Sequence, residues 1–235
     1  VTITGIEWLF KTVAVGTKAP VLVGSRFRRV DGFYGDLSVL AKKGDEIVDK
    51  GAFEVELPRK VNLYRFDAFD ITGSGSLSVV ALDTRDYLDI YKSDGKGGWD
   101  KDWTSSEYYG GTLNYIELSG ENGKPPVPVE GRFYHSTGKN GKAELIIKRN
   151  NPGGLGRHAE RPGSFVSGEV MSLSWDGSVL TENWKSKLVT GYISDFFIDD
   201  LNGDGTKEIV LLVVEGTGKL LGTPESYVLS YRLSI

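Results

Sequence analysis

One short stretch near the end of the chain places oxygen-bearing side chains at alternating positions. This nine-residue stretch, 200–208, contains Gly205, and glycine tolerates the positive φ that a tight bend requires. Hard cations such as Ca2+ take about six to eight oxygen ligands, which alternate residues of a tight loop can turn toward one point. The stretch offers five candidate ligands: the side chains of Asp200, Asn202, Asp204 and Glu208, and the carbonyl of Thr206.

The segments on both sides of this loop indicate strands. Residues 192–198 are mostly apolar, and residues 209–214 form a continuous apolar, largely β-branched run. An EF-hand would need a glutamate at the twelfth loop position and a helix on each side, but that position is Leu211. The loop is therefore predicted either to hold Ca2+ between two strands or to be a polar hairpin turn, since Asn-Gly and Asp-Gly are hairpin signals by themselves.

Two weaker copies of the loop occur earlier in the chain, so that the pattern repeats about every 65 residues, at Asp70, Ser136 and Asp200. The first copy has Thr72, Ser74 and Ser78 where the last copy has Asn202, Asp204 and Glu208. The middle copy keeps one carboxylate, Glu144. We expect the first copy to be metal-free and the middle copy to carry too little charge for a metal, because Ca2+ sites depend on several carboxylates.

The repeat predicts the fold. Each copy opens with a strand, a glycine turn and an apolar strand, and the chain contains 31 glycines and few helix-forming segments. Such a pattern indicates an all-β structure, and repeated units of about four strands are typical of β-propeller blades. We predict one propeller domain over residues 1–235, with blade-like units at 1–60, 61–127, 128–189 and 190–235.

The acidic loop between apolar strands resembles the FG-GAP or VCBS repeat, the calcium-loop blade motif of integrin-type and bacterial extracytoplasmic β-propellers. The resemblance covers most of the chain through the repeat, but only the last copy has the full ligand set. It implies an extracytoplasmic protein, periplasmic, cell-surface or secreted, in which Ca2+ supports a blade and the surfaces bind partners. It implies the metal ligands Asp200, Asn202, Asp204, Thr206 and Glu208.

Four blades make a small ring for this class. We therefore expect Val1–Ile235 to be the C-terminal part of a larger propeller, with its missing blades supplied by an N-terminal segment or by another chain. The alternative is a chain that closes alone as a compact four-unit body, because a propeller must protect its strand edges. The sequence starts at Val1 without a signal peptide, from which we expect a mature form or a fragment.

Composition narrows the classes of partner. The net charge of −4 lacks the basic excess of nucleic-acid-binding proteins, and the cluster of Arg26, Arg28 and Arg29 is more typical of a solvated strand face. No apolar run is long enough for a transmembrane helix. The chain has no cysteine, which excludes disulfides and thiolate metal sites.

Catalytic signals are weak. There are two histidines, His135 and His158, and no Gly-x-Ser-x-Gly motif. The glycine-rich loop 150–158 lacks the Gly-Lys-Ser/Thr of a phosphate-binding loop. The carboxylate pairs Asp195/Asp199 and Asp83/Asp86 are more typical of solvated turns than of acid–base catalysis.

We therefore predict a non-enzymatic, calcium-stabilised scaffold or module that binds a protein or another ligand. Two alternatives stay open: a structural subunit of an assembly completed by another chain, and a glycan-binding or glycan-cleaving propeller. A glycan site would use an aromatic surface, although large aromatic side chains more often pack between blades. The candidates for such a surface are Trp8, Trp99, Trp103, Trp175, Trp184, Tyr108, Tyr109 and Tyr115.

Overall fold

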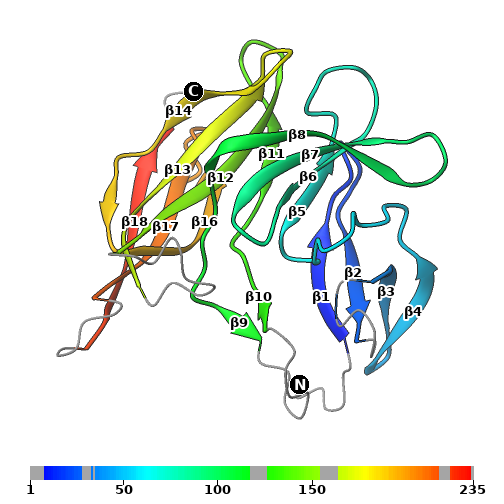
Figure 1. Ribbon diagram of the computed structural model, residues 1–235. Helices are drawn as coiled ribbons and strands as arrows, with labels where there is room; N and C mark the ends of the chain where they lie inside the picture. Colours follow the sequence, from blue (N-terminus) through cyan, green and yellow to red (C-terminus); the bar gives the residue numbers. More distant parts are fainter. Residues whose placement is uncertain are drawn as a thin grey trace.

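The chain folds into four antiparallel sheets that are arranged as a four-bladed β-propeller (Figure 1). The computed structural model describes residues 8–27, 33, 35–116, 126–153, 164–216 and 223–233. The predicted all-β propeller fold is thus confirmed. None of the described segments forms a helix that is long and apolar enough to cross a membrane.

The first two blades are four-stranded meanders, in which each strand pairs with the next one along the chain. The first blade consists of β1 (Trp8–Val13), β2 (Val21–Arg26), β3 (Leu37–Lys43) and β4 (Glu46–Ala52). The second consists of β5 (Phe66–Phe69), β6 (Ser78–Leu82), β7 (Tyr87–Ser93) and β8 (Trp99–Tyr108).

The third blade is also a meander, and the fourth has three strands within the described residues. The third consists of β11 (Tyr134–Thr137), β12 (Ala143–Pro152), β13 (Phe165–Trp175) and β14 (Leu180–Lys185), and β15 (Val189–Thr190) pairs with β13. The fourth consists of β16 (Tyr192–Asp199), β17 (Glu208–Glu215) and β18 (Glu225–Arg232). A ribbon of β9 (Tyr115–Ile116) and β10 (Val127–Pro128) connects the second and third blades.

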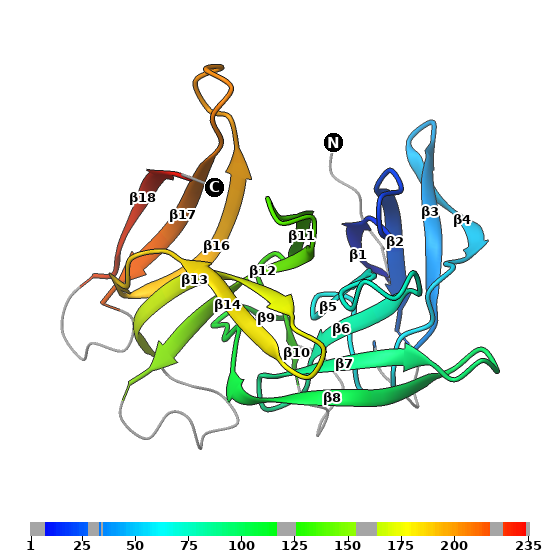
Figure 2. The same ribbon diagram turned by 90° about the horizontal axis from the view of Figure 1, so that it is seen from above.

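The first strand of each blade lies nearest the centre of the molecule, as Figure 2 shows from above. β6, the second strand of blade two, is buried along its whole length. Its Val79 and Ala81 pack with residues of the first blade, and its Val80 and Leu82 pack with residues of the third. Both faces are thus covered, which is why this strand reads as a continuous apolar run rather than as an alternating pattern.

Three apolar clusters join neighbouring blades. The first contains Val23 and Val79, from blades one and two. The second joins blades two and three, and the third joins blades three and four. Four of the five tryptophans pack against these clusters instead of forming an aromatic surface: Trp99, Trp103, Trp175 and Trp184.

Asn150, on β12, ties the third blade to the fourth. Its side chain is fully buried and donates to the carbonyls of Gly111 and Ile193, each over 2.9 Å. Its Oδ1 accepts a hydrogen bond from the backbone nitrogen of Ile193, also over 2.9 Å. One side chain therefore makes three hydrogen bonds to backbone groups of two other segments.

Replacing this side chain tests the connection. Asn150→Ala removes the side-chain partner of the Gly111 carbonyl and of the Ile193 backbone nitrogen, whereas the Ile193 carbonyl keeps its hydrogen bond from Lys148. Each buried orphan costs about 1–3 kcal/mol. We expect the variant to lose about 3 kcal/mol or more of its free energy of unfolding in urea melts. The control is Asn140→Ala, at an exposed loop residue whose side chain accepts one hydrogen bond from the Lys142 backbone. Equal urea midpoints for the two variants would contradict the role of Asn150 in joining the third blade to the fourth.

Candidate functional site

A pocket of about 240 Å3 opens at the axis, where the first strands of the blades approach one another. All four blades contribute to its wall. Lys11 comes from β1, Tyr64 precedes β5, and Asp195 lies on β16. The remaining lining residues are Asn114, Val129, Glu130, Gly131, Arg132 and Ser194.

Arg132 and Asp195 form one pair in this wall. The Arg132 backbone nitrogen donates to Oδ1 of Asp195 over 3.1 Å, and its Nε lies 3.3 Å from Oδ2. The guanidinium also lies over the ring of Phe197, 5.7 Å from the ring centroid. A register shift between Ile193 and Asp195 bends β16 at this point, and bulges of this kind re-aim side chains.

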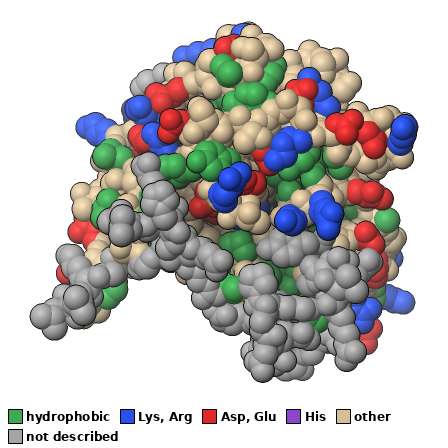
Figure 3. Space-filling model, in the orientation of Figure 1, with side chains coloured by type: hydrophobic (Ala, Val, Ile, Leu, Met, Phe, Trp, Pro, Cys, Tyr) green, Lys and Arg blue, Asp and Glu red, His purple; other side chains and the backbone are tan. Residues whose placement is uncertain are grey.

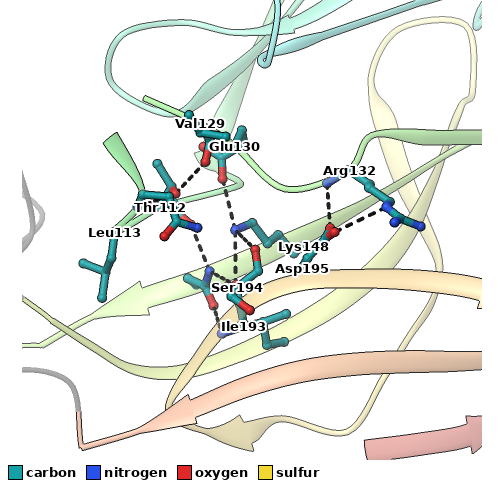
Figure 4. A network of polar contacts seen from close by, with 12 residues as sticks. Thr112, Leu113, Val129, Glu130, Arg132, Lys148, Ile193, Ser194 and Asp195 are labelled. Atoms are coloured by element: carbon teal, nitrogen blue, oxygen red, sulfur yellow. Dashed lines mark hydrogen bonds and ion pairs between the residues drawn. The ribbon is translucent and has the colours of Figure 1, made fainter. Parts of the chain in front are cut away.

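Lys148 and Glu130 form a second pair beside the pocket, buried from solvent (Figure 4). Nζ of Lys148 lies 3.3 Å from Oε1 of Glu130, and it donates to the carbonyls of Ile193 (3.1 Å) and Ser194 (3.2 Å). Within the described residues, neither carboxylate oxygen of Glu130 accepts a hydrogen bond. Removing either partner would strand a buried charge, which makes the pair a fixed part of the pocket wall.

Lys11 differs from the other charged residues at the axis. Its Nζ makes one long hydrogen bond, 3.5 Å, to the carbonyl of Phe66, and it lies over the rings of Phe66 and Phe133. No carboxylate of the described residues lies within 4.0 Å of it. Burial lowers the pKa of Lys11, and the more distant charges of Asp67 and Asp195 oppose that shift.

His135 connects three blades beside the pocket. Its Nδ1 lies 2.7 Å from Oδ2 of Asp67, its Nε2 lies 2.7 Å from the carbonyl of Gly16, and its ring stacks on Phe69. Both ring nitrogens face acceptors, and both can donate only in the imidazolium form. The hydrogen bond to Asp67 is the main cause that raises the pKa of His135. The second histidine, His158, lies outside the described residues.

The predicted metal loop joins β16 to β17, and the loop of the first copy joins β5 to β6 at the equivalent position. Asp200 accepts hydrogen bonds from the backbone nitrogens of Gly203, Asp204 and Gly205 at 2.7–3.2 Å. Asp70 does the same for Ser74 (3.1 Å) and Gly75 (2.6 Å). Gly75 and Gly205 have φ values of 80° and 83°, which confirms the predicted bend.

The remaining predicted ligands lie around this bend. Oδ1 of Asn202 accepts from the Asp204 backbone over 2.9 Å, and Oε2 of the buried Glu208 accepts from the Leu201 backbone over 3.0 Å. The guanidinium of Arg232, on β18, pairs with Asp204, and its Nε lies 3.9 Å from Oε1 of Glu208.

The fit of this loop to Ca2+ is therefore partial. The donor set is of the right chemistry, and Asp200 already shapes the backbone as a calcium loop requires. However, no group of three His, Cys, Asp or Glu side chains in the described part of the chain converges at metal-binding distance. A cation at this position would have to displace Arg232 from Asp204.

The members of each carboxylate pair considered from the sequence bind different partners. Asp195 binds Arg132, whereas Asp199 accepts a hydrogen bond from the Asp200 backbone. Asp83 accepts hydrogen bonds from the turn that follows it, and Asp86 pairs with Arg65.

Basic and acidic side chains are interspersed over the face seen in Figure 3, without a broad basic area.

Comparison with known proteins adds no family: no protein-family model matches the chain, and no curated protein matches it.

Sequence reasoning missed the pocket. Its charged residues come from three distant segments of the chain and share no motif. One signal was available, because Lys148 follows the apolar run Leu145, Ile146 and Ile147, where a buried charge needs a partner.

The pH dependence of stability tests the role of His135. Because its pKa is raised in the folded state, its stabilisation is fully present below the unfolded pKa of about 6.5 and is lost as pH rises through the folded pKa. We expect the urea midpoint of the wild type to fall above this pH, relative to that of His135→Gln. At acidic pH the free energy of unfolding of the wild type should exceed that of the variant by on the order of 2 kcal/mol. Parallel pH profiles for the two proteins would refute this role.

Proposed function

We propose that this protein is a non-enzymatic β-propeller module that binds a small polar ligand, or a polar group of a larger partner, in its axial pocket. The observation that carries the proposal is the wall of that pocket, to which all four blades contribute polar side chains. The wall contains both hydrogen-bond donors and acceptors, which suits recognition of a polar ligand.

The state of the charged groups supports a binding role over catalysis. General acid–base chemistry needs a titratable group within reach of the ligand and free to exchange a proton. His135 has both ring nitrogens engaged, and Asp195 is held by Arg132. The acidic partner of Lys148 is buried in an ion pair. These groups are suited to orienting a ligand.

The proposal includes the FG-GAP or VCBS class, with Ca2+ in the loop of the fourth blade and an extracytoplasmic setting. The support is the repeated loop: it occurs between the first and second strands of blades two and four with the same hydrogen bonds to its first aspartate. Ca2+ would be held by Asp200, Asn202, Asp204 and Glu208 with the carbonyl of Thr206, and its role would be to fix the β16–β17 hairpin.

Blocking the pocket tests the binding function. Asn114 is an exposed residue of the pocket wall, so Asn114→Trp should fill the opening without disturbing a core. We expect a ligand-observed NMR screen with a pool of monosaccharides and disaccharides to find binders whose signals are lost with this variant. The control is Ser106→Trp, at an exposed position on the outer strand β8, and it should keep them. Binders that are unaffected by Asn114→Trp, or a screen without binders, would reject the proposal.

A metal titration tests the loop. We expect millimolar Ca2+ to raise the melting temperature of the wild type and a chelator to lower it, because a cation that binds the folded state stabilises it. In the variant Asn202→Thr/Asp204→Ser/Glu208→Ser the last loop acquires the side chains of the first copy. This variant should lose the response, whereas Asp70→Asn should keep it. A melting temperature that changes with neither Ca2+ nor chelator would argue against a metal in this loop.

A further inference from the structure

We propose that the ligand of the axial pocket is a sugar acid, with its carboxylate on Nζ of Lys11 and its hydroxyl groups on Asp195, Asn114 and Tyr64. The inference rests on the proposed binding function and names the chemistry of the ligand. The free acid and the terminal acidic sugar of a glycan present the same groups, and the experiment below separates them.

The pairing of charged side chains at the axis favours a ligand with a carboxylate. The cation of Arg132 is matched by Asp195, that of Lys148 by Glu130, and that of His135 by Asp67. Lys11 has no carboxylate partner within 4.0 Å among the described residues. Its ammonium group makes one 3.5 Å hydrogen bond and lies over two aromatic rings. A buried ammonium gains most from an anion that reaches it with direct hydrogen bonds.

The rest of the wall suits hydroxyl groups, which both donate and accept hydrogen bonds. Asp195 offers carboxylate oxygens as acceptors, and Arg132 offers guanidinium donors. The hydroxyl of Tyr64 donates to the carbonyl of Phe10 over a long 3.4 Å, and burial raises the pKa of Tyr64, so it stays protonated. Glu130 also lines the pocket, but both of its carboxylate oxygens are buried and Oε1 lies 3.3 Å from Nζ of Lys148, so it belongs to the wall and is not a ligand contact.

The size of the pocket limits the ligand to about one sugar ring. Its volume of about 240 Å3 lies below the roughly 300–1,000 Å3 of typical small-molecule pockets. A single acidic monosaccharide fits this space, whereas a longer oligosaccharide would have to extend out of the opening.

The ligand would also connect the first and fourth blades. Apolar clusters join blades one to two, two to three and three to four, but none of the clusters in the described residues joins four to one. Lys11, on the first blade, and Asp195, on the fourth, face the same pocket. A ligand that contacts both should therefore raise the melting temperature as well as bind.

The experiment measures binding of glucuronate, with glucose as the neutral control, by NMR titration and calorimetry. We expect the wild type to bind glucuronate about tenfold or more tightly than glucose, since hydrogen bonds to a charged group contribute this much. Lys11→Met should abolish the preference, and Lys50→Met, at an exposed position of β4, should keep it. Melting curves of Lys11→Met should show that it is folded, because the variant removes one long hydrogen bond.

A pH series gives a second readout. Glucuronate binding should weaken as pH rises through the lowered pKa of Lys11, whereas glucose binding should not change. The carboxylates whose charges act on Lys11 are those of Asp67 and Asp195, and burial raises the pKa of Tyr64 in the same pocket wall. The methyl glycoside of glucuronate imitates a sugar linked to a glycan. If it binds as tightly as glucuronate, the site is assigned to a glycan terminus. If it binds more weakly, the site is assigned to the unlinked sugar acid.

The possible failures are distinct. Equal affinities for glucuronate and glucose, both lost in Asn114→Trp, would overturn the sugar-acid inference and leave the binding function intact. A preference for glucuronate that survives Lys11→Met would overturn the role of Lys11. Absence of glucuronate binding at millimolar concentration would overturn the inference, and the sugar screen would then decide the binding function by itself.

Discussion

Charge burial at the axis is the constraint on which this structure depends. A small ring brings the first strands of its blades so close together that their side chains leave water, and a buried charge is tolerated only with a partner. The chain meets this condition with two shielded pairs, His135 with Asp67 and Lys148 with Glu130. It also pairs the more exposed Arg132 with Asp195. Lys11 is the exception, and it faces the pocket.

The same polar contacts hold the blades in position. His135, on the third blade, reaches Asp67 on the second and the carbonyl of Gly16 after β1. Lys148 and Asn150, both on β12, bind backbone groups of β16. Apolar clusters bring neighbouring blades together without fixing direction, whereas these hydrogen bonds have one geometry. Lys148 also binds the carbonyl of Ser194, which lines the pocket, so this contact both joins two blades and fixes part of the pocket wall.

Much of the fold could be predicted from the sequence because the repeat is local. Each copy places a glycine turn between a strand and an apolar strand, and the structure has such a turn at the equivalent position in blades two, three and four. The comparison of Asp70 with Asp200 adds a finding: both loops take the same backbone hydrogen bonds although only one has a full set of acidic ligands. The first aspartate shapes the loop, and whether a metal occupies it stays a prediction.

The sequence by itself determined the all-β class, the repeated blade unit and the bend at each acidic or polar loop, because these follow from residue types within a few positions of one another. Only the tertiary structure decided which charges meet. Lys11, Glu130, Arg132 and Asp195 come from parts of the chain with no common motif, and they converge because the blades curve around one axis. Pairing across that axis depends on distances of a few ångströms between separate blades, and no local pattern encodes such distances.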